Sequence, residues 1–177
     1  QFKKQVELLL EECFAWEATL TPAQKAEHQN KFCSKKDVFG YVLALEKEQA
    51  VGIAMVLKRT IIYEGQSITL GGIGGMCTRE DKRFKGIASQ ILVKAFEELK
   101  KTNCDIVYIC AGIDKLWMIK FYGKVGFVPL GRPHTYLGKS GKRYTDHDAM
   151  IAPVNSVEKF QYVLNQKSPF DIGVGNW

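Results

Sequence analysis

A strand-like segment leads through a basic loop into an amphipathic helix, and this order constrains the fold more than any other feature of the chain. The helix is predicted over residues 87–99, where apolar residues recur on one side and charged residues on the other. The segment before it, residues 73–78, has the composition of a buried strand. Strand, loop and helix in this order are typical of mixed α/β sheets.

The remaining segments extend this α/β order over the chain. Helical spacing predicts a first helix around residues 6–14, and threonine before proline predicts a second helix that begins after Thr21-Pro22. Apolar runs between polar turns predict a meander of strands at 38–45, 51–57, 59–63, 67–70 and 73–78. Beyond residue 99 we expect a strand at 105–110, a helix at 114–124, strands at 127–130 and 149–151, a short helix within 155–167, and an irregular tail.

Length and composition predict one domain over residues 1–177. A chain of 177 residues with 46% hydrophobic residues can bury one substantial core. No apolar run approaches the roughly 20 residues that cross a bilayer, and the first residues lack a signal-peptide pattern. The 5 cysteines are odd in number and show no C-x-x-C spacing, which is typical of reduced thiols. We therefore expect a cytoplasmic protein with no membrane partner.

Charge and histidine spacing argue against two further classes of site. The net charge of +6 favours anionic partners, but the lysines are scattered and form no basic arm, so nucleic acid is not an expected partner. The 3 histidines lie far apart in sequence and far from any cysteine pair. The sequence therefore predicts no metal site.

The loop and helix start at residues 83–89 suit a pyrophosphate. A helix start offers unpaired backbone N–H groups and about half a positive charge. Gly86 and Ala88 are small enough to let phosphate oxygens approach the backbone, and Arg83 and Lys85 add positive charge. The chain has no P-loop motif and no dinucleotide fingerprint. A phosphorylated cofactor bound at this turn is the resulting hypothesis.

A run of glycines at residues 71–75 needs a separate explanation. It is explained equally well by a bulge entering a central strand and by close approach of a cofactor or substrate to the backbone. Both interpretations stay open at the level of the sequence.

Two motifs in the right order carry a resemblance to a known family. Residues 83–88, Arg-Phe-Lys-Gly-Ile-Ala, satisfy the pattern [RQ]-x-x-G-x-[GA], and residues 121–127 match F-Y-x-x-x-G-F. Together they resemble the GNAT acetyltransferase superfamily over roughly residues 73–130. The resemblance implies the GNAT acyl-CoA N-acyltransferase fold, with a mostly antiparallel central sheet and helices on both faces. It also implies acetyl-CoA as co-substrate and no metal.

The resemblance assigns cofactor-binding roles to two segments. Main-chain groups of Met76, Cys77 and Thr78 would bind the pantetheine arm and the acetyl carbonyl. The pyrophosphate would be held by the turn and helix start, which comprise Arg83, Phe84, Lys85, Gly86, Ile87, Ala88 and Ser89. Cys77 has no histidine nearby in sequence, so buried packing is favoured over a nucleophilic role.

Tyr122 matches the family tyrosine that protonates the leaving thiolate. A phenol with an ordinary pKa of about 10 stays protonated at neutral pH, and this pKa is close to that of a thiol, which is near 8.5. The alternative is an ordinary half-buried tyrosine on a helix. The general base is left open between a water relayed to Glu64 or Asp171, a backbone carbonyl, and His134.

The end of the chain, Pro169–Trp177, resembles the tail of aminoglycoside 2′-N-acetyltransferases. This resemblance implies that Glu64, Asp171 and Trp177 contact the acceptor, since carboxylates and an indole together suit a cationic aminosugar. Asp146 and Asp148 add further negative charge. A hydrophobic plug that pins the tail to the core is the alternative role for Trp177.

Three functions remain open at this point. The first is N-acetylation of a primary amine on a small molecule, with an aminoglycoside as the sharpest candidate. The second is a peptide or protein N-acetyltransferase, which predicts an open groove lined by backbone. The third is a non-catalytic acyl-CoA-binding module in which Tyr122 only packs. A homodimer is left open.

Overall fold

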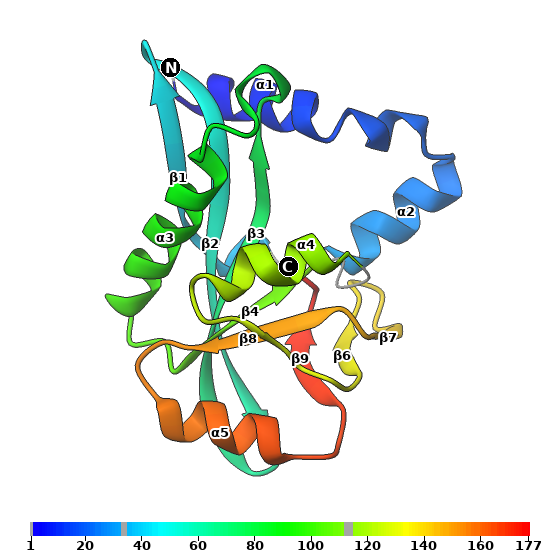
Figure 1. Cartoon of the computed structure of the whole chain (residues 1–177). Helices are drawn as coiled ribbons and strands as arrows, with labels where there is room; N and C mark the ends of the chain where they lie inside the picture. The colour runs from blue at the N-terminus through cyan, green and yellow to red at the C-terminus, as the bar shows by residue number, and fades with distance from the viewer. Residues whose placement is uncertain (1, 33–34, 112–114) are drawn as a thin grey trace.

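The computed structural model describes residues 2–32, 35–111 and 115–177, which form two sheets covered by helices (Figure 1). The helices are α1 Phe2–Cys13, α2 Pro22–Lys31, α3 Ile87–Lys100, α4 Leu116–Gly123 and α5 Val157–Asn165, with 3-10 turns at Ala15–Thr19, Lys35–Asp37 and Glu80–Lys82. The strands are β1 Val38–Glu46, β2 Gln49–Tyr63, β3 Gln66–Thr78, β4 Ile106–Cys110, β5 Val128–Pro129, β6 His134–Leu137, β7 Arg143–Asp146, β8 Ala149–Pro153 and β9 Phe170–Val174.

The larger sheet is mixed and mostly antiparallel, as predicted. Its strand order is β1-β2-β3-β4-β8-β5, and among the described residues β3 and β4 are its one parallel pair. Helix α3 makes the crossover between these two parallel strands. A smaller sheet of order β7-β6-β9 lies beside it, with β6 and β9 parallel (Figure 1).

Alternating side chains of the central strands build two hydrophobic clusters on opposite faces of the larger sheet. Val56 belongs to the cluster beneath α3 and α4, whereas Leu57 belongs to the cluster formed with α5 and the smaller sheet. Val107 and Tyr108 of β4 divide between the clusters in the same way. A third, smaller cluster around Leu9 packs α1 against β2. Helices therefore cover both faces.

Several helix boundaries follow from the predicted local chemistry. The Thr21 hydroxyl accepts from the backbone N–H of Gln24, and the Gln24 side chain accepts from the backbone N–H of Thr21, which completes a capping box. The predicted stripe of α3 is buried as a set, comprising Ile91, Leu92, Ala95, Phe96 and Leu99. The second helix and the amphipathic helix are thus confirmed.

The strand meander is longer and more continuous than the sequence suggested. The segments predicted at 51–57 and 59–63 form the single strand β2, and those at 67–70 and 73–78 form β3. The predicted irregular tail is wrong, because its residues form β9 and pair with β6. The strands β6 and β7 were not anticipated. Asp114, at the start of the predicted helix 114–124, lies outside the described residues.

The described part of the chain contains no helix that is both long and apolar enough to span a membrane.

Candidate functional site

Strands β3 and β4 separate after a short stretch of pairing. Their register runs from Leu70 opposite Ile106 to Gly72 opposite Tyr108, and in the described chain it goes no further. Beyond this point β3 contains a bulge, since its two residues Gly75 and Met76 lie opposite the single residue Ala54 of β2. Gly75 in the bulge has a φ of 53°. The backbone of β3 from residue 73 onward is therefore not paired with β4.

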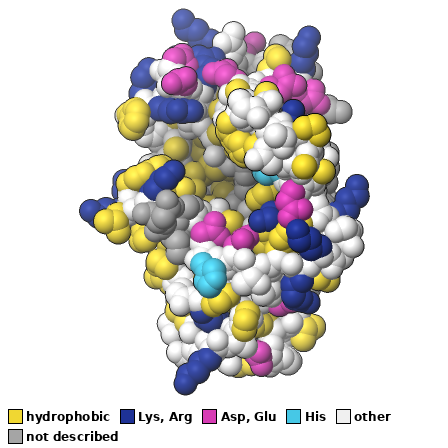
Figure 2. Space-filling model, turned by 90° about the vertical axis from the view of Figure 1, so that its right-hand side faces the viewer, with side chains coloured by type: hydrophobic (Ala, Val, Ile, Leu, Met, Phe, Trp, Pro, Cys, Tyr) yellow, Lys and Arg dark blue, Asp and Glu magenta, His cyan; other side chains and the backbone are white. Residues whose placement is uncertain are grey.

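A cavity of about 980 Å³ opens where the two strands separate. Its walls come from the ends of β3 and β4 and from α1, the following 3-10 turn, and α4. Figure 2 looks into a hollow whose interior is largely hydrophobic. The residues that matter most for chemistry are Met76 on β3, Cys110 on β4 and Tyr122 on α4, which all line this cavity.

Tyr122 is buried at the wall of this cavity. Its ring packs edge-on against Phe121 and Phe127, with centroids 5.0 and 5.9 Å away. Burial, with a smaller contribution from Cys110, raises the pKa of Tyr122 from 10.0 to about 12. The phenol is therefore neutral at physiological pH, but it is a weaker acid than the sequence argument assumed.

A second cavity of about 810 Å³ adjoins the first. Trp16, His28, Phe32, Cys110 and Asn176 line both cavities. The second cavity is lined by three carboxylates, Glu27, Asp146 and Asp148, and by Lys31. Glu27 pairs with Lys142 at 2.8 Å, and Asp146 lies 3.9 Å from Lys31. Glu17, in the wall of the first cavity, lies 3.3 Å from His28. The joint space thus has apolar walls and a negatively charged side.

The predicted phosphate turn lies at the surface. Arg83, Phe84, Lys85 and Gly86 are all exposed, and α3 begins at Ile87. Gly86 has a φ of 79°, a conformation that glycine adopts without strain, and the first helical hydrogen bond runs from the Gln90 N–H to its carbonyl. The side chains of Arg83 and Lys85 bond backbone carbonyls of Thr78 and Asp81. The free N–H groups of the first turn therefore face solvent beside two cations.

The three residues at the end of β3, Met76, Cys77 and Thr78, differ in their surroundings. Cys77 packs with the small cluster under α1, and burial, helped by Cys13, strongly raises its pKa. A thiol in this state is a poor nucleophile, consistent with the packing role expected from the sequence. Met76 lines the cavity, whereas the Thr78 hydroxyl is buried without a hydrogen-bond partner.

The three residues predicted to contact the acceptor do not meet at one site. Glu64 lies in the turn between β2 and β3, at the opposite end of β3 from Met76, and its carboxylate accepts from the Ser168 hydroxyl at 2.6 Å. Asp171 on β9 pairs with Arg143 at 2.6 Å. Neither residue belongs to the walls of the two cavities. Of the three, only Trp177 lines the larger cavity.

Trp177 also explains part of the glycine run. Its indole is 7% exposed and is so close to β3 that a Cβ at Gly72 would lie 2.0 Å from a ring carbon. The guanidinium of Arg59 lies 4.2 Å from the centre of the indole and donates to the carbonyl of Ile172. The close neighbour at Gly72 is thus the chain's own tail, a possibility that neither sequence interpretation included, while the bulge at Gly75 matches one of them.

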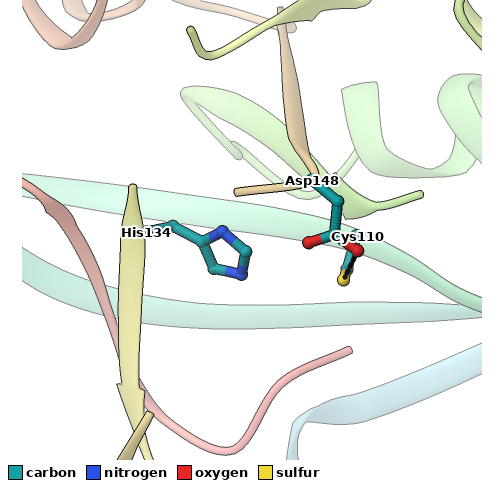
Figure 3. Close-up of side chains that lie close together, drawn as sticks. All are labelled: Cys110, His134 and Asp148. Carbon is teal, nitrogen blue, oxygen red and sulfur yellow. Dashed lines mark hydrogen bonds between the residues drawn. The ribbon is translucent and has the colours of Figure 1, made fainter. Parts of the chain in front are cut away.

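A group of potential metal ligands escaped the sequence analysis. The thiol of Cys110 donates to a carboxylate oxygen of Asp148 at 3.2 Å, and His134 on β6 faces both of them (Figure 3). One ligand atom from each residue lies within 4.8 Å of the other two. These residues, 24 and 14 positions apart in sequence, come together only in the folded chain, where β4 pairs with β8, and no local motif reports their proximity.

Three features of the site are typical of a known enzyme family. They are the cavity between two separating strands, the exposed turn at a helix start, and the tyrosine that lines the cavity. A family model described as "Acetyltransferase (GNAT) domain" matches residues 2–130. The chain belongs to the GNAT acetyltransferase family. As a GNAT protein it is an N-acyltransferase whose acyl donor is an acyl-coenzyme A thioester. No curated protein matches the chain at a significant level.

Solved structures share the GNAT fold at low sequence identity. A GNAT family N-acetyltransferase from Escherichia coli (YhbS), solved in complex with CoA, is 13% identical, with a TM-score of 0.60 over 96% of this chain and 82% of that one. The ribosomal-protein-S18-alanine N-acetyltransferase of Escherichia coli is 11% identical, with a TM-score of 0.55 over 88% and 90% of the two chains. A protein from Enterococcus faecalis, described as a probable N-acyltransferase, is 19% identical, with a TM-score of 0.54. The match covers 72% of this chain but only 30% of that protein.

Proposed function

We propose that this GNAT domain transfers an acetyl group from acetyl-CoA to the primary amine of a small molecule. The observation that supports this most directly is a pair of adjoining cavities with common wall residues. The larger one is lined by the part of β3 that does not pair with β4 and by Tyr122, and the smaller one is lined by carboxylates. A thioester held at β3 would then face a neutral amine of an acceptor whose other, charged groups are held by the carboxylates.

The cofactor would bind along β3 and the start of α3. Pantetheine amides would pair with the backbone around Met76, Cys77 and Thr78, where β3 has lost its pairing with β4. The pyrophosphate would accept hydrogen bonds from the N–H groups at Ile87, Ala88 and Ser89, with Arg83 and Lys85 turning toward it. Gly86, with a φ of 79°, has no side chain, and nothing lies within 4 Å of the place a Cβ would take, so a phosphate can approach the backbone there.

Tyr122 would assist departure of the thiolate. Because burial raises its pKa to about 12, the phenol keeps its proton and can donate a hydrogen bond throughout the reaction. Complete transfer of the proton to a thiolate with a pKa near 8.5 is uphill for such a phenol. The role that best fits is therefore donation of a hydrogen bond to the developing sulfur anion. The C–S bond breaks as the C–N bond forms, and the proton lost by the attacking nitrogen passes to solvent or to the departing thiolate.

The acceptor would enter from the side of the smaller cavity. Asp146 and Glu27 would favour a cationic group of the acceptor there, and Trp16 and Phe32 would offer apolar or cation–π contact to its body. The segment from α1 to α2 arches over this side of the sheet (Figure 1), which suits a small molecule better than an extended peptide in an open groove. Aminoglycosides are polycationic and remain the sharpest test within this class. Glu64 and Asp171 have no part in this proposal.

A thiol-release assay tests the proposal. Acetyl-CoA is mixed with the protein and with aminoglycosides, polyamines, simple aryl-alkyl amines or lysine peptides, and free CoA is measured. We expect release with at least one small amine and none with peptides. Tyr122→Phe should lower kcat by at least tenfold and leave the Kd for CoA within about twofold, whereas Tyr41→Phe, a change on the exposed face of β1, should leave both unchanged.

Two outcomes would overturn the proposal. CoA binding without thiol release on the whole panel would favour the non-catalytic acyl-CoA-binding module. Release with lysine peptides alone would favour the peptide or protein N-acetyltransferase.

A further inference from the structure

Buried polar atoms without partners converge where the two sheets meet. His134 is 0% exposed, and neither of its ring nitrogens has a hydrogen-bond partner. The Oδ1 atom of Asp148 is also buried and unpartnered, while its Oδ2 atom accepts from the Cys110 thiol at 3.2 Å. Leaving buried polar atoms unpaired is costly, and a group of them in one place is rare in folded proteins. The arrangement therefore calls for a ligand that all three residues can bind.

The three side chains are held in place by strand pairing. Cys110 ends β4 and Asp148 immediately precedes β8, and these strands are antiparallel neighbours joined beyond Cys110 by a bond from the Ala111 N–H to the Asp148 carbonyl. His134 begins β6 in the smaller sheet, where its ring packs edge-on against Tyr108 with centroids 5.5 Å apart. In Figure 3 the imidazole points toward the carboxylate and the thiol. The positions are thus set by the fold rather than by a loop.

We propose that Cys110, His134 and Asp148 form a binding site for a divalent transition-metal ion, and that Zn²⁺ is the ion that fits best. Sulfur, imidazole nitrogen and carboxylate oxygen are the donor set that zinc takes in proteins. One thiolate and one carboxylate balance the two positive charges of the ion.

The spacing is close to what zinc requires. Ligands about 2.0–2.3 Å from a tetrahedral ion lie about 3.5 Å from one another. The Cys110–Asp148 separation of 3.2 Å already matches this value, and the whole set lies within 4.8 Å. Small side-chain rotations close the remaining distance.

The fourth coordination position would face the cavities. Cys110 lines both of them and Asp148 lines the smaller one. Water or a polar group of a bound molecule would complete the tetrahedron from that side. The ion would also join the two sheets, since His134 begins β6 of the smaller sheet and Cys110 ends β4 of the larger one.

Binding must release one proton. The metal–sulfur bond forms as the S–H bond of Cys110 breaks, and the proton passes to the buffer. Without an ion the thiol carries its proton, which it donates to the Asp148 carboxylate at 3.2 Å. Metal uptake by this site therefore depends on pH, and its proton count can be measured.

Titration of the full chain with CoCl₂ under reducing, anaerobic conditions tests the site. We expect one equivalent of Co²⁺ to bind, with a thiolate-to-cobalt charge-transfer band and visible bands of tetrahedral intensity. ZnCl₂ should displace the cobalt, release about one proton, and raise Tm by about 5–10 °C at a hundredfold excess over its Kd. Cys110→Ser should abolish the charge-transfer band, and Asp148→Asn should weaken binding at least tenfold.

Cys104→Ser is the matched control, because Cys104 is a second reduced thiol buried in the core away from the cluster. Its charge-transfer band should equal that of the wild type. Absence of the band in the wild-type protein would overturn the proposal, whatever the variants do, and so would an unchanged band in Cys110→Ser. Because Asp148 is only partly buried, Asp148→Asn should fold, and wild-type affinity in this variant would equally contradict the site. None of these measurements depends on acyl transfer.

Discussion

Replacement of Gly72 by alanine should destabilise the protein by about 3–5 kcal/mol, because the new methyl group would occupy the place of the Trp177 indole. A Cβ at residue 72 would lie 2.0 Å from a ring carbon, whereas ordinary contacts lie at 3.4–4 Å. Gly72 is in the middle of β3, paired with Leu57 on one side and Tyr108 on the other, so its backbone cannot retreat. The indole must move instead.

The magnitude follows from the burial of that indole. Trp177 is 7% exposed, and a buried aromatic side chain removes about 150–250 Å² from water. At about 25 cal/mol per Å², its expulsion would cost up to about 4–6 kcal/mol, and partial relaxation lowers this to about 3–5 kcal/mol. For a domain of this size, the change corresponds to a fall in Tm of about 6–20 °C.

Urea unfolding followed by fluorescence and circular dichroism measures the effect. Gly40→Ala is the matched control, because Gly40 also lies in a strand and a Cβ there meets nothing within 4 Å. A double-mutant cycle with Trp177→Ala isolates the clash: in that background, Gly72→Ala should change stability by less than about 1 kcal/mol. If Gly72→Ala is tolerated in the wild-type protein, or is equally harmful without the indole, the steric argument is refuted.

Three further predictions concern the cofactor turn, the tyrosine and a helix cap. Gly86→Ala should weaken CoA binding at least fivefold by calorimetry, whereas Gly141→Ala, with a similar φ of 83° and open surroundings, should not. Because folding raises the pKa of Tyr122 from 10.0 to about 12, its contribution to stability is complete below pH 10 and is lost as the pH rises through 12. The fall in unfolding free energy between pH 8 and pH 11 should therefore be smaller in Tyr122→Phe than in the wild type, by about 1.4 kcal/mol, and an equal fall would contradict the shift. Thr21→Ala should lower the unfolding free energy in urea by about 1 kcal/mol through loss of the capping box, and no change would show that α2 does not depend on it.

The parts of the fold that the sequence predicts well are those with a local physical signal. The stripe of α3 and the Thr21-Pro22 helix start each depend on contacts between residues a few positions apart. The two GNAT motifs could be found for the same reason, since each lies on one short segment. Their placement at the surface turn and at the cavity wall then follows from the family fold.

The parts that were missed depend on contacts between distant segments. Strand β9 has only 5 residues, and it is stabilised by pairing with β6 rather than by its own pattern. Cys110, His134 and Asp148 meet only after β4, β8 and β6 have assembled. Glu64 and Asp171 were proposed as acceptor contacts from the resemblance of the tail, and no local pattern could report that the fold keeps them out of the cavities.

The long hairpin of β2 and β3 has a consequence for how the molecule opens. Its residues alternate between the two large hydrophobic clusters, so Val56 and Leu57 anchor opposite faces of one sheet. Because both clusters contain side chains of this hairpin, neither cluster can be fully exposed to water while the hairpin remains packed. Backbone amides at the centre of these strands should therefore exchange with deuterium only when the whole domain unfolds, whereas the arch from α1 to α2, which shares few core residues with them, should exchange through smaller openings.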